Sequence, residues 1–190
     1  MPALTLHRLT PDRWADFETL FGPSGAYGGC WCTWWRQTRS AYSDNGNAGN
    51  KRLARSLVDE GSVMGLLGYV GGQPAAWVSV APRGEFASLA RSPVLKPIDD
   101  QPVWSLVCLF VGKEYRGNGL AVRMIGGAID YIAKRGGRIV EAYPSLPKGD
   151  RPLPPVSSFM GTPAMFEAAG FERVARPSAA KAIYRYTIQP

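Results

Sequence analysis

The sequence predicts an α/β protein built on one mixed β-sheet, and three observations carry that prediction. Apolar runs over 63–70 and 74–80 flank the turn Gly71-Gly72-Gln73, which is typical of an antiparallel hairpin. An apolar run over 103–111 leads through a glycine-rich loop into a helix, and a short strand over 138–143 follows. A strand, a helix and a strand in this order place the two strands parallel. The sheet is therefore expected to combine both kinds of pairing.

The other elements are predicted from helix start and stop signals. Thr10-Pro11 is expected to begin a helix, because proline is favoured at the first helical position, and Thr162-Pro163 repeats that signature. Gly170 is expected to end the second of these helices. The expected order, with about seven strands and four helices, is a strand (4–9), a helix (to Phe21), a polar stretch (43–50), a helix (51–60), the hairpin, an irregular stretch (82–102), the strand-loop-helix-strand unit, a loop (144–160), a short helix (162–169) and two strands (171–175 and 182–188).

Length and composition restrict the class of protein. A chain of 190 residues with 45% hydrophobic and 19% charged residues predicts one globular domain over 1–190. No apolar run approaches the roughly 20 residues that span a bilayer, and the N-terminus lacks the regions of a signal peptide. The net charge of +7 is spread along the chain without a basic block, so neither a nucleic acid nor a membrane is expected as a partner. Three cysteines, an odd number, favour a reduced, cytoplasmic setting over a secreted disulfide scaffold.

The loop Arg116-Gly-Asn-Gly-Leu-Ala121 carries the chemistry predicted for this chain. It lies between a buried strand and the start of a helix, where several backbone N–H groups point at one place and the helix dipole favours negative charge. Gly117 and Gly119 put no Cβ in the way of an approaching anion, and Arg116 adds a fork-shaped cation suited to phosphate. We therefore expect this loop to bind an anion.

The spacing Arg-x-x-Gly-x-Ala over 116–121 resembles the pyrophosphate-binding loop of the GNAT superfamily, the acetyl-CoA-dependent N-acetyltransferases. A second motif, Ala164-Met-Phe-Glu-Ala-Ala-Gly-Phe171, is similar to the helix that ends in Gly-Phe in that superfamily. The order of elements also matches, so the resemblance covers nearly the whole chain. It implies a GNAT acyl-CoA N-acyltransferase fold in which central strands four and five splay apart.

The resemblance also implies where acetyl-CoA binds as a co-substrate. In the family, the pantetheine arm lies in the gap between strands four and five and pairs with the backbone of strand four, here that of Leu109, Phe110 and Val111. The acetyl carbonyl would then lie near the Leu109 amide, which would polarise it. Phe166 stands where many members have a tyrosine acid, and it has no proton to give. The residues implied to bind the cofactor are Leu109, Phe110, Val111, Arg116, Gly117, Asn118, Gly119, Leu120, Ala121 and Phe166.

The proton-transfer half of the site departs from the family pattern. Ser105 stands where some members have a glutamate, and it is a poor base unless it relays through water. Glu141 and Tyr143 alternate onto one face at the end of the strand over 138–143. Tyr143 could act as the acid and Glu141 as the group that binds or deprotonates the amine. The alternatives are that Tyr143 packs, that Glu141 pairs with an arginine, and that catalysis uses proximity and bulk water.

The resemblance implies that the segment joining the first two helices, Tyr27-Gly-Gly-Cys-Trp-Cys-Thr-Trp-Trp35, forms part of the acceptor wall. Trp31 and Trp34, with Trp35, fall at helical spacing and would give one aromatic face for an amine, unless they cover the core or a dimer contact. Cys30 follows two glycines and is expected to be an accessible thiol, whereas Cys-x-Cys is too tight for the usual zinc spacing, so no metal is expected. Asp99 and Asp100 could hold a cationic acceptor or only face solvent.

These observations predict direct transfer of an acetyl group from acetyl-CoA to a primary amine of a small molecule or peptide. A homodimer is a candidate assembly, as in many GNAT proteins. One alternative is a non-catalytic acyl-CoA-binding or regulatory module of the same fold. A second is a nucleotide-binding regulatory domain, which the antiparallel hairpin opposes because doubly wound folds expect parallel strands.

Overall fold

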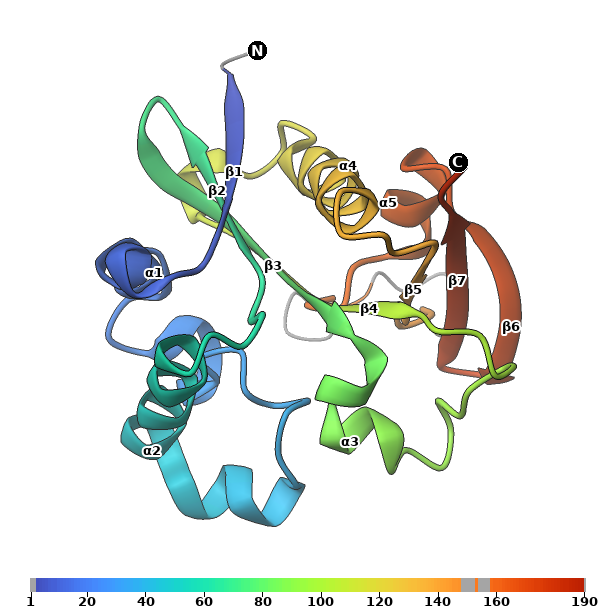
Figure 1. Ribbon diagram of the computed structural model, residues 1–190, viewed down its shortest axis with the longest axis horizontal. Coiled ribbons are helices and arrows are strands. Elements are labelled where there is room, and N and C mark those ends of the chain that lie inside the picture. The colour runs from blue at the N-terminus through green and yellow to red at the C-terminus, as the bar shows by residue number, and fades with distance from the viewer. Residues whose placement is uncertain (1–2, 148–152, 154–157, 190) are drawn as a thin grey trace.

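The computed structural model describes residues 3–147, 153 and 158–189. Within this part of the chain, seven strands form one sheet in the order β1-β2-β3-β4-β5-β7-β6 (Figure 1). All neighbouring strands are antiparallel except β4 and β5, which are parallel, so the mixed sheet predicted from the sequence is confirmed. The strands are β1 (Leu4–Arg8), β2 (Leu66–Val70), β3 (Gln73–Pro82), β4 (Trp104–Val111), β5 (Ile139–Ala142), β6 (Glu172–Ser178) and β7 (Lys181–Thr187).

The helices follow the expected order, with additions. The described residues form α1 (Trp14–Phe21), α2 (Arg39–Asp59), α3 (Ala87–Ala90), α4 (Leu120–Ala133) and α5 (Pro163–Ala168). A 3₁₀ turn, Pro11–Arg13, precedes α1, and another, Arg83–Glu85, precedes α3 inside the stretch expected to be irregular. The side chain of Thr162 accepts a hydrogen bond from the Met165 amide, so this residue caps α5 as predicted. Part of the loop expected over 144–160 lies outside the described residues.

Helix α2 begins well before the predicted residue. The stretch 43–50, expected to be a polar connection, is helical with a kink at Gly46, whose φ is +55°. The Thr38 side chain caps the helix by accepting from the Ala41 amide. Asn45 donates to the Gln37 side chain at 2.8 Å, and Asn50 donates to the Gly29 carbonyl at 3.0 Å. Tertiary hydrogen bonds of this kind override the low helix propensity of asparagine and glycine, which is why the sequence pattern missed this part of the helix.

The helices cover both faces of the sheet (Figure 1). On one face, α4 packs against β3, β4 and β5 through a cluster that includes Met124, Ile125, Leu106 and Val140. On the other face, α1 and α2 cover the first half of the sheet in an aromatic cluster around Phe17 and Trp77, and α3 packs on β3, β4 and β7 in a smaller cluster. Each buried side chain of this type contributes roughly 1.5–3 kcal/mol by leaving water.

A β-bulge in β4 decides which side chains meet at the centre of the sheet. Ser79 of β3 pairs with Cys108 and Val80 pairs with Leu106, so Val107 is the extra residue. The bulge resets the alternation of side chains. Leu109 therefore joins Leu106 on the α4 face, while Val107 and Cys108 pack into the two clusters on the opposite face.

Candidate functional site

The loop between β4 and α4 presents an open glycine backbone at a helix N-terminus. Gly119 is the N-cap of α4 with φ +67°, and Gly117 has φ +81°, both in the left-handed region that favours glycine. A Cβ built at either position would have no heavy atom within 4 Å, so the backbone is free on that side. The first N–H groups of α4 have no partner within the helix and point toward this loop. The geometry is suited to an anion.

The flanking residues hold the loop and leave its polar groups outward. Arg116 donates through Nε to the Val111 carbonyl at 2.9 Å, which anchors the side chain and leaves the terminal nitrogens of the guanidinium for other contacts. Asn118 is exposed, as are the two glycines. Leu120 is buried against the sheet, and Ala121 is half-buried. The loop is thus tied to the core at both ends.

Strands β4 and β5 separate next to this loop. Their parallel pairing joins Trp104, Ser105 and Leu106 to residues of β5, whereas β4 continues to Val111. Beyond the pairing, the Leu109 amide donates to the Phe159 carbonyl at 2.7 Å. The amide that was predicted to lie near an acetyl carbonyl therefore already has a partner from the chain itself. Phe110 packs on the opposite face, where its ring lies 5.5 Å from that of Phe21.

Phe166 is a core residue of α5 that packs beside the segment bonded to the Leu109 amide. It is fully buried, and its ring packs edge to face on Phe171 at 5.3 Å. A Cβ at Gly161 would lie 2.6 Å from the Phe166 ring and 3.3 Å from the Leu109 side chain. Gly161 also has φ +80°, so only glycine fits this position without strain. The described segment 158–161 is thus held closely between β4 and α5.

The three residues predicted to carry proton transfer lie together on the face opposite α4. The Tyr143 hydroxyl lies 2.7 Å from Ser105 Oγ and donates to Glu141 Oε2 at 2.7 Å. Each of the three side chains is at most 1% exposed. Burial, followed by the charge of Glu141, raises the pKa of Tyr143 well above its ordinary value. The hydroxyl is therefore a weak acid where it lies.

Two arginines that sequence reasoning missed neutralise this buried carboxylate. Arg83 Nη1 donates to the Tyr143 hydroxyl at 2.7 Å and lies 3.4 Å from Glu141 Oε2. Arg185 donates through Nε to Glu141 Oε1 at 2.8 Å. Arg185 is directly opposite Glu141 in the β5–β7 pairing, so knowledge of that register would have identified it. Glu141 therefore pairs with arginines, which is one of the alternatives predicted from the sequence.

Asp99 extends the same network to the surface. Its carboxylate accepts from Arg185 Nη1 at 2.6 Å and from Nη2 at 2.9 Å, a bidentate pair. The hydrogen bond from Arg185 lowers the pKa of Asp99 to about 2. Asp99, expected to hold a cationic acceptor or face solvent, instead pairs with a cation of the chain. Asp100 is exposed.

The prediction that the tryptophans form one helical face is wrong. Residues 31–37 form turns, so helical spacing does not apply. Trp31 is 2% exposed in the aromatic cluster beneath α1, with φ +44°. Trp34 packs edge to face on Tyr42 at 4.8 Å, and Trp35 packs against the separate cluster under α3. Cys30 is half-buried rather than open to solvent.

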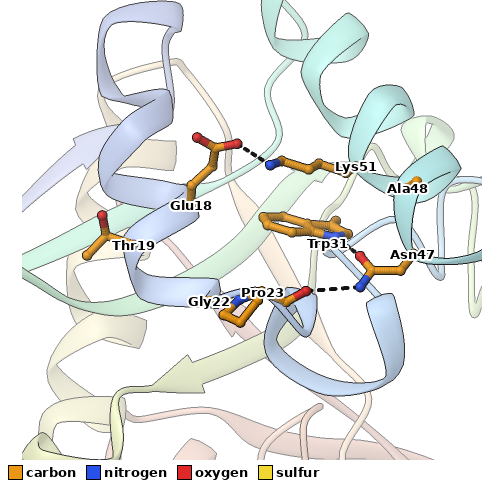
Figure 2. A pocket seen from close by; sticks show the side chains of 8 residues that line it. All are labelled: Glu18, Thr19, Gly22, Pro23, Trp31, Asn47, Ala48 and Lys51. Atoms are coloured by element: carbon orange, nitrogen blue, oxygen red, sulfur yellow. Dashed lines mark hydrogen bonds and ion pairs between the residues drawn. The ribbon is translucent and has the colours of Figure 1, made fainter.

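Trp31 borders a surface pocket of about 750 Å³ between α1 and α2. Figure 2 shows Lys51 extending over the indole toward Glu18, with which it forms an ion pair. The Lys51 ammonium lies 5.0 Å from the ring centroid, a cation–π contact. Asn47 accepts from Trp31 Nε1 at 2.6 Å and donates to the Pro23 carbonyl at 3.0 Å. A cation of the chain itself therefore already contacts this ring beside the pocket.

Two absences among the described residues bear on the class of site. No group of three or more His, Cys, Asp or Glu side chains in that part of the chain is arranged to hold a metal ion. No helix in it is long and apolar enough to cross a membrane.

Comparisons with known proteins agree with this geometry. The model of the acetyltransferase (GNAT) family matches residues 28–147. A GNAT-family acetyltransferase from Streptococcus agalactiae is 12% identical with a TM-score of 0.59, covering 98% of this chain and 96% of its own. The PaiA N-acetyltransferase from Thermoplasma acidophilum, solved in complex with coenzyme A, is 9% identical with a TM-score of 0.56, covering 98% and 99%.

A third solved structure, AAC(6')-Ib in complex with ribostamycin and coenzyme A, is 16% identical with a TM-score of 0.59 and covers 97% of this chain and 93% of its own. At these identities the solved structures are evidence for the fold alone. A search of curated proteins found no match. Because the family model spans more than half of the chain and includes the β4–α4 loop, the protein belongs to the GNAT acetyltransferase family.

Proposed function

We propose that this protein transfers an acetyl group from acetyl-CoA to a primary amine of a small molecule or peptide. The observation that carries the proposal is the open glycine backbone at the N-terminus of α4, beside the point where β4 and β5 separate. A helix start suited to an anion, next to a strand edge that β5 no longer covers, fits a ligand that has a diphosphate at one end and amides along its length. Three free cysteines are in keeping with a cytoplasmic enzyme.

The loop before α4 and the backbone of β4 would bind different parts of acetyl-CoA. The N–H groups from Gly117 to Ala121, with Arg116, would hold the pyrophosphate. The backbone of Leu109, Phe110 and Val111 would pair with the pantetheine amides, and Phe166 would support that arm from α5. Acetyl-CoA would supply the thioester whose carbonyl the Leu109 amide would polarise. For that, Phe159 must release the amide, because the 2.7 Å hydrogen bond now uses its only proton.

The proposed acceptor class rests on the fold neighbours and on the charge of the site. The ribostamycin complex provides one example of this fold with a small-molecule ligand beside coenzyme A. In this chain, the acidic groups near β5 are already paired with Arg83 and Arg185. The amine would then be held by other groups than Asp99 or Glu141. Of the predicted lining of the acceptor side, Cys30 and Trp34 are half-buried and stay candidates, whereas Trp31 is buried in the aromatic cluster.

We propose that Tyr143, Glu141 and Ser105 orient the end of β5, and that proton transfer uses proximity and water. Their burial and the raised pKa of Tyr143 support this division. Tyr143→Phe at saturating acetyl-CoA should then keep turnover within a few-fold of wild type. A loss of 10²-fold or more, the usual effect of removing a general acid, would instead establish Tyr143 as the acid.

The binding half is tested with a charge reversal and a matched control. Arg116→Glu should weaken coenzyme A binding by about ten- to hundred-fold, since a hydrogen bond to a charged group contributes roughly 1.5–3 kcal/mol. Arg91→Glu makes the same change at an exposed residue after α3 and should leave binding unchanged. Isothermal titration calorimetry with coenzyme A measures both. Equal affinities for the two variants would remove the pyrophosphate assignment.

The reaction itself is tested by thiol release from acetyl-CoA over a panel of amines. Release that depends on an amine supports acetyl transfer. Tight coenzyme A binding without release for any amine would favour the alternative, a non-catalytic acyl-CoA-binding module of the same fold.

A further inference from the structure

Cys32 and Cys108, two of the three cysteines of this chain, are far apart in sequence but pack in the same apolar cluster. Cys30 and Cys32 lie in the segment before α2, and Cys108 follows the bulge residue of β4. Cys108 pairs with Ser79 of β3, two residues along that strand from Trp77, whose indole contacts the Cys32 sulfur. Cys30 is half-buried. The Cys32–Cys108 pair is not used in the proposed acetyl transfer.

The groups around the Cys32 sulfur are those that stabilise a thiolate. Trp77, fully buried in β3, donates its Nε1 proton to this sulfur at 3.1 Å. The Ser79 hydroxyl donates to the Met64 carbonyl at 3.1 Å, so Trp77 is the donor to this sulfur. Sulfur is a weak acceptor as a thiol and a stronger one as a thiolate, so this donor favours the anion.

A buried guanidinium adds positive charge on the same side. Burial lowers the pKa of Arg36, and the charge of Cys32 raises it. Its nearest carboxylate oxygen, on the half-exposed side chain of Glu85, is 3.8 Å away. Among the described residues, Arg36 Nε is buried without a hydrogen-bond partner. A cation that is desolvated and incompletely paired favours a negative charge nearby, and Cys32 is positioned to provide it.

The backbone at Cys32 is held in a conformation that costs energy. Trp31 has φ +44° and Cys32 has φ +59°, two consecutive residues other than glycine in the left-handed region. Such a residue costs of order 1–3 kcal/mol and persists where the surroundings determine it, commonly at functional sites. Here the Trp31 indole is fixed by Asn47 and the Cys32 sulfur by Trp77. This conformation holds the sulfur against Trp77 of β3, within the cluster that also contains Cys108.

We propose that Cys32 and Cys108 are an oxidant-sensitive dithiol, in which hydrogen peroxide converts the pair into a disulfide that ties the turns before α2 to β4. The Cys32 thiolate attacks one peroxide oxygen, the O–O bond breaks, and a sulfenic acid forms while hydroxide takes up a proton as water. Cys108 then attacks the Cys32 sulfur, the S–O bond breaks, and the second hydroxide leaves with the Cys108 proton as water. Two thiols lose two electrons, and one peroxide becomes two waters.

The ionisation of the two sulfurs agrees with this order of events. The interaction with Cys108 and the hydrogen bond from Trp77 lower the pKa of Cys32, against the opposing effect of burial. The interaction with Cys32, together with burial, raises the pKa of Cys108 well above its ordinary value. Cys32 is therefore the attacking thiolate and Cys108 the thiol that resolves the sulfenic acid.

The experiment maps thiols in the wild-type protein before and after peroxide. The reduced protein is exposed to hydrogen peroxide, remaining thiols are alkylated, and digested peptides are analysed by mass spectrometry. We expect two of the three thiols to be lost, a cross-linked peptide joining Cys32 to Cys108, an alkylated Cys30, and full recovery with dithiothreitol. A link through Cys30, a disulfide between two chains, direct oxidation of Cys32 to sulfinic acid, or three unreacted thiols would each overturn the proposal.

Variants separate the pair from the neighbouring cysteine. Cys30→Ser is the matched control and should still form the internal disulfide at an unchanged rate. Cys32→Ser should lose no thiol under the same treatment, while Cys108→Ser should lose the disulfide and leave Cys32 to be trapped as a sulfenic acid by dimedone. The wild-type mapping identifies the linkage directly, so the proposal is tested even if a variant fails to fold. The outcome is independent of whether the protein transfers an acetyl group.

Discussion

Replacing Glu141 by glutamine tests whether the buried carboxylate holds the network under β5 together. Glu141 is 1% exposed and accepts from Arg185, from Tyr143 and, at 3.4 Å, from Arg83. Glutamine keeps the size of the side chain and removes its charge. Both arginine side chains are only 13% exposed, so they would keep their positive charges with little water to replace the lost partner.

The size of the effect follows from burial. Removing one member of a buried ion pair costs about 3–5 kcal/mol, because the partner is left as an uncompensated charge. Arg185 keeps its bidentate contact with Asp99, which limits its share, whereas Arg83 keeps only hydrogen bonds to neutral groups. We therefore expect a loss near the lower end, about 3 kcal/mol.

Urea denaturation followed by tryptophan fluorescence measures this loss. With a slope of about 2 kcal/mol per molar urea, a change of about 3 kcal/mol moves the midpoint down by about 1.5 M at unchanged slope. Asp99→Asn is the matched control, because it also removes a carboxylate from Arg185, but at an exposed position. It should move the midpoint far less. Equal shifts for the two variants, or a Glu141→Gln midpoint at the wild-type value, would refute the reasoning.

Two further predictions concern α4 and β7. Gly119→Ala should destabilise the protein by about 1 kcal/mol, because φ is +67° at that position. Gly126→Ala lies in the helix interior, where a Cβ meets open space, and should stabilise the protein by about 0.5–1 kcal/mol. Thermal unfolding that ranks the two variants in the reverse order would contradict the cap geometry. Burial lowers the pKa of Lys181 to about 8. Between pH 8 and about 10.4 the unfolded chain therefore binds more protons than the folded chain, and the free energy of unfolding of the wild type should rise with pH. The Lys181→Met variant lacks this group, so its free energy of unfolding should rise less over the same window. A difference in urea midpoint between the two proteins that stays constant with pH would exclude this effect.

Much of the fold could be predicted because local signals agree with the tertiary structure. The glycines after β2 and before α4, and the Thr-Pro starts of helices, specify backbone conformations that few other residues adopt. The stretch 43–50 could not be predicted, since Asn45 and Asn50 become helical through hydrogen bonds to residues distant in sequence. Propensity does not contain that information.

The candidate site divides in the same way. The open backbone of the loop before α4 was predictable because it depends on left-handed conformations that glycines reveal. The surroundings of Glu141 were not, because Arg83 and Arg185 reach it from other elements. The tryptophan segment was misread because left-handed φ angles at Trp31 and Cys32 break the helical period, and neither residue type signals such a conformation. The cysteine pair likewise depends on the β4 bulge, which no local pattern indicates.

The hydrogen bond from Leu109 to Phe159 also has a consequence for affinity. Any ligand that pairs with β4 at this amide competes with the chain itself, so the apparent dissociation constant is the intrinsic one divided by the fraction of molecules in which the amide is free. If that hydrogen bond contributes about 1 kcal/mol, the fraction is roughly one in six and binding weakens about sixfold. The same free energy is recovered when the ligand leaves and the Phe159 carbonyl returns. A protein built in this way gives up affinity for any ligand that pairs with β4 at this amide.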